Sequence, residues 1–187
     1  MSTVQLSTYD KRGYHPKAGL LKRGGWYLVN ALLFNSWLLP VSPPKRWLLR
    51  CFGAMVGQGV VIKPRVNVKY PWLLRIGAES WIGEGAWIDN LTWVDIGNDV
   101  CISQEAYLLT GNHDYKDPSF GLLLGAIRIE EGAWIGARAV VCPGVTLAAA
   151  SMVTAGSVIQ QNTEACGIYR GNPAQRYRTR VLRPRNG

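Results

Sequence analysis

The chain has 187 residues, of which 48% are hydrophobic and 18% are charged, and its formal net charge is +9. This length suits one domain with a flanking extension, and this hydrophobic content excludes an intrinsically disordered chain. The positive charge predicts an anionic partner, and nucleic acid, anionic lipid and a phosphorylated small molecule all remain open at this point.

The cysteines and the apolar segments bear on the cellular compartment of the protein. The four cysteines are widely spaced and form no CxxC pair, which excludes a zinc ribbon or a disulfide framework and favours reduced thiols. The longest apolar stretch, residues 26–41, is interrupted by polar residues and proline, and it is shorter than the roughly 20 residues of a spanning helix. The first ten residues lack the pattern of a signal peptide. We therefore expect a cytoplasmic protein, with membrane association as an open alternative.

Residues 1–55 are predicted to form a leader and a helical cap. Apolar residues at helical spacing predict helices over residues 22–39 and 43–52, separated at Pro40. Ser42 is predicted to cap the second helix. Two interpretations remain open for the helices: they cover one end of the fold, or they contact a membrane surface, because basic residues flank their Trp and Leu side chains. These basic residues are Lys22, Arg23, Lys45, Arg46 and Arg50.

An aliphatic residue recurs every six positions over residues 56–160. The 15 positions are Val56, Ile62, Val68, Ile76, Ile82, Ile88, Ile96, Ile102, Leu108, Ile129, Ile135, Val141, Leu147, Val153 and Ile159. A small or β-branched residue often lies two positions earlier, as at Ser80, Ala86, Thr92, Val100, Ala106, Ala133, Ala139, Val145, Ser151 and Ser157. Neither a helical nor a simple strand period explains a strict repeat of six.

The repeat predicts an all-β fold. Each hexapeptide forms one short strand and a turn, three strands complete a triangular coil, and stacked coils form a parallel β-helix of about five coils. The aliphatic side chain points inward. Glycine follows it at several positions, and we expect these glycines to adopt turn conformations that other residues find costly. They are Gly57, Gly77, Gly83, Gly97 and Gly136.

The register of the repeat changes along the chain. The first three coils begin 20 residues apart, with two extra residues at Leu74-Arg75 and Val94-Asp95, whereas the last two begin 18 residues apart. Between Leu108 and Ile129 the register fails. Residues 109–128 are therefore predicted to project from the scaffold, which is where function tends to lie.

The chain has two histidines. His113 lies in the projecting segment, where it is well placed as a general base, although an unpaired surface histidine is the alternative. His15 lies in the polar leader and is predicted to have no role. Because two histidines cannot supply a three-histidine zinc site, we expect no metal.

Residues 161–187 are predicted to form a loop and a basic tail. Residues 162–171 read as a loop, and Asn172-Pro173 leads into the basic segment. The arginines of this segment are Arg176, Arg178, Arg180, Arg183 and Arg185.

Several segments together resemble a known family. They are Trp87-Ile88-Asp89-Asn90, Val100-Cys101-Ile102-Ser103-Gln104, Thr110-Gly111-Asn112-His113-Asp114-Tyr115, Gly132-Ala133-Trp134-Ile135-Gly136-Ala137, Pro143-Gly144-Val145-Thr146 and Gly171-Asn172-Pro173-Ala174. Residues 56–180 resemble the maltose/galactoside branch of hexapeptide-repeat O-acetyltransferases, and most closely the WcaF-like colanic acid biosynthesis acetyltransferases. The resemblance implies a left-handed coil, which the repeat alone does not determine.

The resemblance also implies a function. It implies direct transfer of an acetyl group from acetyl-CoA to a sugar hydroxyl in exopolysaccharide or cell-surface glycan synthesis, by a homotrimer with its sites between subunits. His113 is then the general base, and Asp89 and Asn90 are acceptor-binding candidates. The implied CoA-binding residues are Trp134, Ala137, Ala155, Arg176 and Arg178. CoA phosphates would give the basic tail a role, so we expect no nucleic acid. The alternatives are acetylation of serine or a drug, and a non-enzymatic binding module.

Overall fold

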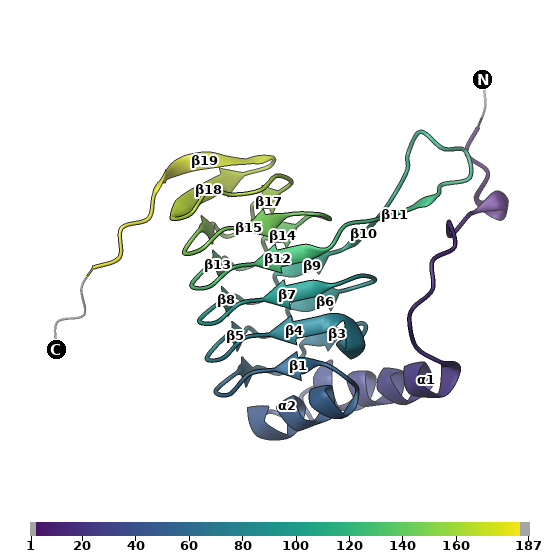
Figure 1. Cartoon of the computed structure of the whole chain (residues 1–187), viewed down its shortest axis with the longest axis horizontal. Helices are drawn as coiled ribbons and strands as arrows, with labels where there is room; N and C mark the ends of the chain where they lie inside the picture. Colours follow the sequence, from purple (N-terminus) through teal and green to yellow (C-terminus); the bar gives the residue numbers. More distant parts are fainter. Residues whose placement is uncertain (1–2, 184–187) are drawn as a thin grey trace.

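The computed structural model describes residues 3–183, so Arg185 of the predicted basic tail lies outside the described residues. Three sheets of stacked parallel strands form a triangular prism (Figure 1). Sheet A contains β1 (Met55–Val56), β4 (Leu74–Ile76), β7 (Val94–Ile96), β12 (Ile127–Ile129) and β15 (Thr146–Leu147). Sheet B contains β2 (Val61–Ile62), β5 (Trp81–Ile82), β8 (Cys101–Ile102), β13 (Trp134–Ile135), β16 (Met152–Val153), β18 (Gly167–Gly171) and β19 (Ala174–Thr179). Sheet C contains β3 (Asn67–Val68), β6 (Trp87–Asp89), β9 (Tyr107–Leu109), β14 (Val140–Val141) and β17 (Val158–Ile159).

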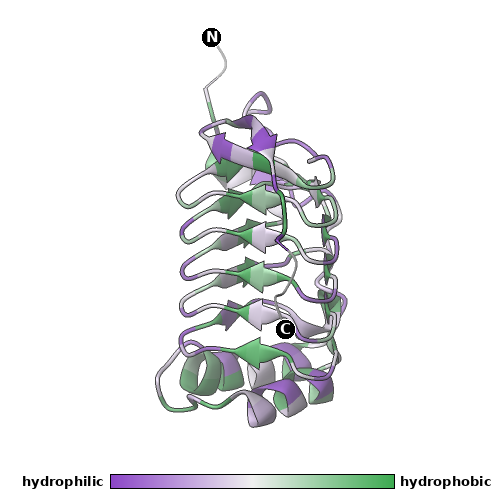
Figure 2. Ribbon diagram, turned by 90° about the vertical axis from the view of Figure 1, so that its left-hand side faces the viewer, coloured by the Kyte–Doolittle hydropathy of each residue, from purple (hydrophilic) through white to green (hydrophobic). Residues whose placement is uncertain are grey.

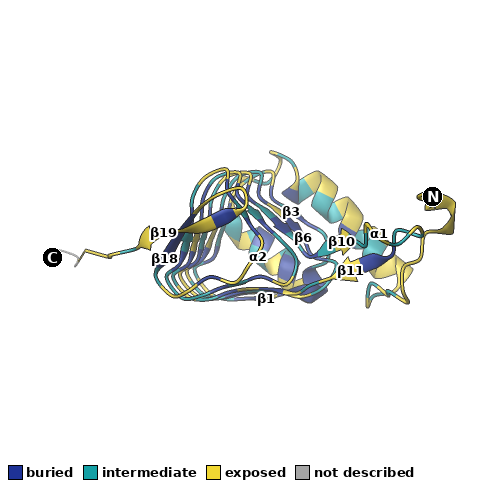
Figure 3. Cartoon of the chain, turned by 90° about the horizontal axis from the view of Figure 1, so that it is seen from above, coloured by how far each residue is buried: buried dark blue, intermediate teal, exposed yellow. Residues whose placement is uncertain are grey.

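The predicted β-helix is confirmed. Sheets A and C have five strands each, and β18 adds a sixth parallel strand to sheet B, so five complete coils are followed by part of another. All 15 aliphatic repeat positions are buried, none of them more than 9% exposed. Hydrophobic strands alternate with more polar turns along the stack (Figure 2), and a view down the stack shows buried strands around the core (Figure 3).

The glycines that follow the aliphatic residues have a different role from the predicted one. The left-handed backbone conformation occurs two residues later, for example at Arg138 with φ 58°. A Cβ atom on Gly136 would lie 2.5 Å from the Ala155 nitrogen in the next coil, and one on Gly57 would lie 2.5 Å from the Ala78 nitrogen. These positions therefore need glycine because successive coils approach closely there, and the prediction of costly turn conformations was wrong.

The longer corners of the early coils are built into sheet A. The extra residues begin the three-residue strands β4 and β7, where Leu74 and Val94 are fully buried. A short 3-10 turn, η3 (Pro71–Leu73), precedes β4. Thr92, one of the small or β-branched residues noted in the repeat, is only half-buried, because Val94 lies two positions before Ile96 and fills the inward position at that corner.

The N-terminal helices lie across the first coil (Figure 1). Helix α1 (Leu20–Val29) continues as one π-helical turn, η2 (Asn30–Phe34), and α2 (Ser42–Cys51) follows. Trp26, Phe34 and Leu49 are each at most 2% exposed, and the Trp26 indole donates to the Val68 carbonyl over 2.8 Å. The helices thus cover the open end of the prism, as the cap interpretation predicts.

Two details of the predicted helices were wrong. The first helix ends at Phe34, not at residue 39, because the following Ser36 carbonyl accepts from the Arg65 amide in the first coil. Ser42 does not cap α2. Its hydroxyl oxygen accepts from the Ile62 amide over 2.9 Å and so ties the helix to β2. Within residues 3–183, none of the helices combines the length and the apolar character that crossing a bilayer requires.

The predicted loop after the repeats is partly a strand. Residues 167–171 form β18, which pairs in parallel with β16 and antiparallel with β19. Tyr169 is 3% exposed, and its hydroxyl accepts from the Glu164 amide over 2.8 Å. The β18–β19 hairpin therefore extends sheet B at the end of the prism opposite the helices (Figure 1).

Candidate active site

The break in the repeat is an antiparallel hairpin that projects from the prism. It consists of β10 (Gly111–His113) and β11 (Leu122–Leu124), with Gly111 opposite Leu124 and His113 opposite Leu122. Leu109 and residues 127–128 still belong to β9 and β12, so the projection is shorter than the predicted segment 109–128. One residue separates β9 from β10 and two residues separate β11 from β12, so the scaffold holds both strands of the hairpin.

His113 is half-buried at the end of β10. Its Nδ1 lies 2.9 Å from the Phe120 carbonyl oxygen, and its ring stacks on the Phe120 ring with centroids 4.4 Å apart. A carbonyl oxygen can only accept a hydrogen bond, so Nδ1 carries the proton. In the neutral imidazole this leaves Nε2 with a free lone pair, which is the state that a general base needs.

An N-terminal arm, residues 3–19, braces the hairpin. It contains the 3-10 turn η1 (Leu6–Thr8). The Arg12 guanidinium contacts Asp114 at 3.2 Å and Asp117 at 3.0 Å. Ser119 hydrogen bonds, together with Arg12, hold the pKa of Asp117 at about 2. The hairpin thus keeps a carboxylate for Arg12 at all but strongly acidic pH.

A pocket of about 340 Å³ lies beside His113, between the arm and the prism. Tyr9 stands edge-on to the His113 ring, with centroids 5.5 Å apart. The Tyr14 hydroxyl donates to the Leu91 carbonyl over 3.2 Å, and burial raises the pKa of Tyr14. Because Tyr14 stays protonated, this hydrogen bond fixes the arm across the pocket.

The two acceptor-binding candidates differ in their hydrogen bonds. The Asn90 amide donates to the Tyr70 carbonyl over 2.6 Å and accepts from the Tyr70 amide over 2.9 Å. Asp89 is 8% exposed; its carboxylate lies 2.8 Å from the Lys69 ammonium and accepts from the Tyr107 hydroxyl over 3.1 Å. Burial and the Asp89 charge raise the pKa of Tyr107 to about 12, so Tyr107 remains a donor.

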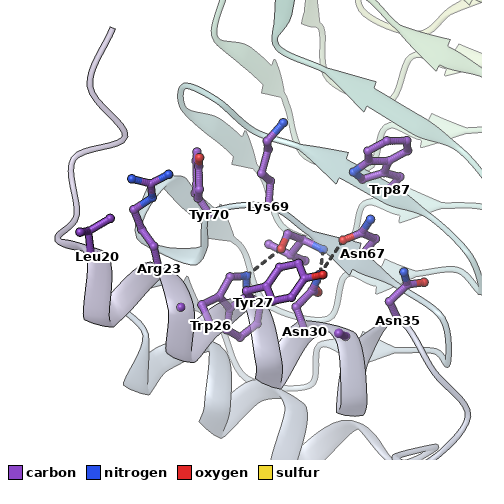
Figure 4. A pocket seen from close by; sticks show the side chains of 13 residues that line it. Leu20, Arg23, Trp26, Tyr27, Asn30, Asn35, Asn67, Lys69, Tyr70 and Trp87 are labelled. Carbon is purple, nitrogen blue, oxygen red and sulfur yellow. Dashed lines mark hydrogen bonds between the residues drawn. The ribbon is translucent and has the colours of Figure 1, made fainter.

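A groove of about 620 Å³ runs between α1 and sheet C (Figure 4). Arg23, Lys69 and Tyr70 line both this groove and the pocket beside His113, so the two spaces adjoin. Tyr27 and Trp87 add aromatic faces. The combined space offers flat apolar surfaces together with cationic and hydrogen-bonding groups.

Three CoA-binding candidates cluster around one turn of the prism. Trp134 lies on β13, is 38% exposed, and donates from its indole to the Ser103 hydroxyl over 2.9 Å. Ala137 follows in the turn after β13, and its carbonyl accepts from the Gly156 amide over 2.8 Å. Ala155 is exposed in the same turn of the next coil. Among the described residues, no group accepts from the Ala137 amide.

The two arginine candidates lie on β19 and are exposed. Arg176 contacts Glu164 at 3.2 Å and donates to the Thr179 hydroxyl over 3.0 Å. The Arg178 guanidinium lies 5.4 Å from the centre of the Tyr177 ring. Both belong to sheet B, as does Trp134.

Within one protomer these candidates form two separate groups. The β10–β11 hairpin with His113 projects on one side of the prism, whereas β18 and β19 lie on the other side (Figures 1 and 3). The structure therefore does not bring His113 together with the candidates on sheet B. Among residues 3–183, no group of three His, Cys, Asp or Glu residues is arranged to hold a metal ion.

Sequence reasoning missed the arm. Tyr9, Arg12 and Tyr14 contact the hairpin or the pocket, yet they lie in a segment without periodicity. The acidic pair Asp114 and Asp117 in the projecting segment was a signal that a cation should lie near it.

Comparison with known proteins identifies the family. A chain from Escherichia coli K12 that is named as a colanic acid biosynthesis acetyltransferase, WcaF, is 38% identical over 159 residues, which cover 83% of this chain and 86% of that relative. No family model matches the chain. The chain belongs to the WcaF-like hexapeptide-repeat acetyltransferases. The predicted family resemblance and the predicted enzyme class are thereby confirmed.

Solved structures agree with the fold of this acetyltransferase. A hexapeptide-repeat acetyltransferase from Vibrio cholerae, solved with acetyl coenzyme A, has a TM-score of 0.74 at 24% identity and covers 87% of each chain. A maltose O-acetyltransferase from Clostridium difficile has a TM-score of 0.75 at 19% identity, covering 97% of this chain and all of that chain. At these identities the matches show the shared fold.

Proposed function

We propose that this acetyltransferase transfers the acetyl group of acetyl-CoA directly to a sugar hydroxyl, with His113 as the general base. The hydrogen bond between His113 Nδ1 and the Phe120 carbonyl carries the proposal, because it leaves Nε2 free to accept a proton. The acceptor oxygen attacks the thioester carbonyl carbon as its proton passes to Nε2. The carbon–sulfur bond then breaks, and the CoA sulfur leaves as a thiol after taking up that proton.

The thioester oxygen gains negative charge during the attack and needs a donor. The Ala137 amide is suited to this role, since no described residue accepts a hydrogen bond from it. In the same proposal Trp134 and Ala155 flank the pantetheine arm, and Arg176 and Arg178 meet the CoA phosphates as exposed cations.

A sugar acceptor is supported by the groove and pocket that adjoin at Arg23, Lys69 and Tyr70. Aromatic faces beside charged and hydrogen-bonding groups suit a ring that is apolar on its face and polar at its edge. Because the Asn90 amide is bonded to the chain at Tyr70, Asp89 is the better of the two acceptor-binding candidates. The name of the WcaF relative supports a surface polysaccharide as the context.

The separation of His113 from the sheet B candidates supports a site between subunits. In a cyclic homotrimer, the hairpin of one protomer would meet sheet B of its neighbour, and three equivalent sites would form.

The test is thiol release from acetyl-CoA with sugar, serine and chloramphenicol acceptors. We expect release with sugars, and a loss of about 10²–10⁴-fold in kcat/KM in His113→Ala with unchanged CoA binding by calorimetry. His15→Ala is the control, because His15 lies outside the site and is exposed. Undiminished release in His113→Ala would overturn the assigned base, and release with serine or chloramphenicol alone would overturn the acceptor class.

A further inference from the structure

The helical cap exposes an unusual amount of apolar surface. Nine large apolar side chains between residues 20 and 47 are each more than half exposed. They are Leu20, Leu21, Tyr27, Leu28, Leu32, Trp37, Leu38, Val41 and Trp47. Leu20 and Tyr27 line the groove beside sheet C, and the other seven form what we call the cap surface. Soluble proteins rarely expose contiguous apolar patches of this kind unless the patch binds something.

The cap surface is separate from the face by which the helices pack on the prism. Trp26 and Phe34 point to the prism and are buried, whereas Leu21, Leu28 and Leu32 follow one another on an exposed stripe of the same helix. Closing the open end of the β-helix needs only the buried set. The exposed set therefore requires another explanation.

The charge of this end of the molecule is one-sided. Residues 11–78 contain 12 of the 21 Lys and Arg residues of the chain and none of its 12 Asp and Glu residues. Among the described residues, only Arg12, Lys69 and Arg75 of these twelve form an ion pair with a carboxylate. The other nine pair with no carboxylate among the described residues. Lys45 is buried, but six of them lie on the helices or in the first coil, so the end of the molecule that carries the cap surface is electropositive. These six are Lys22, Arg23, Arg46, Arg50, Lys63 and Arg65.

Cations also lie beside tryptophan rings here, of which Trp37 is exposed and Trp72 is buried. The Arg65 guanidinium is 5.9 Å from the centre of the Trp37 ring, and Arg65 is exposed. The Lys22 ammonium is 5.1 Å from the centre of the Trp72 ring. Tryptophan with adjacent basic side chains is typical of surfaces that lie at the boundary of lipid headgroups and acyl chains.

We propose that the cap surface docks this enzyme on an anionic lipid bilayer. Helices α1 and α2 lie across the end of the prism, so both can rest flat on a membrane with the β-helix standing above it (Figures 1 and 2). Leu and Trp side chains would enter the headgroup region, and the unpaired cations would meet anionic lipids. A second copy of the chain fits less well, because it would bring two electropositive surfaces together.

The experiment is co-sedimentation of the full chain with phosphatidylcholine vesicles and with vesicles that also contain phosphatidylglycerol. We expect binding to the anionic vesicles that weakens as salt is added. Trp37→Ser combined with Trp47→Ser should weaken this binding by roughly tenfold or more. Trp81→Ser is the matched control, since Trp81 is 58% exposed on β5 and the two cap tryptophans are each 62% exposed.

Charge is tested separately from apolar contact. Lys63→Gln with Arg65→Gln should reduce binding to anionic vesicles, whereas Lys116→Gln on the hairpin should not.

Should the tryptophan pair impair folding, Leu21→Ser serves instead, because Leu21 is 94% exposed. Absence of binding to anionic vesicles, or binding that survives the tryptophan substitutions, would overturn the proposal. A third result would also overturn it: light scattering shows that the tryptophan variant has a changed oligomeric state, while its vesicle binding stays intact. The cap surface would then join copies of the chain.

Discussion

The two histidines of the chain have different ring atoms available. The Nδ1 atom of His113 faces the Phe120 carbonyl and must donate, whereas Nδ1 of His15 accepts from the Lys17 amide over 3.1 Å. Neutral His113 therefore exposes a basic Nε2, and neutral His15 has its proton on Nε2. The residue type predicts a candidate base, but only the partner of Nδ1 distinguishes the two.

Glycines of the repeat allow a test at the residue scale. Gly136→Ala places a Cβ atom 2.5 Å from the Ala155 nitrogen, so the two coils must separate. We expect a loss of about 1–3 kcal/mol in the free energy of unfolding, measured by denaturant titration. Gly24→Ala is the control: apart from the neighbouring backbone of helix α1 itself, no atom lies within 4 Å of the added Cβ, and we expect a gain of about 0.5–1 kcal/mol. Equal effects of the two substitutions would contradict the close-approach explanation.

Some elements could be predicted from the sequence because their causes are local. An aliphatic residue at every sixth position determines which side chains point inward, so the strands and the break at His113 followed directly. Strand β18 did not follow, because Tyr169 is fixed by hydrogen bonds with Glu164 and with Thr154 of the preceding coil, and not by the repeat. The helix end at Phe34 was missed for the same reason, since it depends on the Arg65 turn.

The candidate site was predictable only in part. His113 became the candidate base because it lies where the register fails. The arm was not found, since Arg12 meets Asp114 and Asp117 across about one hundred residues of chain, and no periodic pattern records such a contact. The different bonding of Asp89 and Asn90 was also hidden, because adjacent polar residues in a sequence look equivalent.

The arm and the hairpin give a prediction at the element scale. Arg12→Gln removes both ion pairs of the arm, so its backbone hydrogen bonds to the hairpin, such as that from Leu122 to the Asp10 carbonyl, should open more often. We expect amide hydrogen exchange of Leu122 to quicken by a factor of roughly two to five at neutral pH.

The stabilising effect of the Arg12 ion pairs on the arm depends on pH, and the sign of this dependence follows from the pKa of Asp117. That pKa is held at about 2, below the usual value of a carboxylate, so the ion pair contributes fully above pH about 4 and is lost as the pH falls toward 2. Lys11→Gln is the control, since Lys11 is exposed beside Arg12 and pairs with no carboxylate among the described residues. Unchanged exchange in Arg12→Gln would mean that backbone hydrogen bonds alone hold the arm.

At the scale of the whole molecule, the two ends and the two sides of the prism carry different chemistry. The helices cover one end, and β18 with β19 extend sheet B at the other end (Figure 1). The hairpin and β19 lie on opposite sides (Figure 3). A rigid prism cannot bend to bring these sides together, so an enzyme that uses both needs a second protomer.

This requirement predicts complementation between two inactive variants. His113→Ala lacks the proposed base, and Ala155→Phe places a bulky side chain in the exposed turn proposed for the pantetheine arm while leaving the hairpin intact. Each variant alone should be inactive, and calorimetry should show that only Ala155→Phe has lost CoA binding. When the two are denatured together and refolded, random mixing gives about one quarter of the sites a native hairpin and a native sheet B from neighbouring protomers. We therefore expect about one quarter of the native thiol-release activity.

Separately refolded variants that are then combined should stay inactive if subunits do not exchange. A site contained in one protomer would give no recovery in either mixture, because no protomer would then carry both native parts.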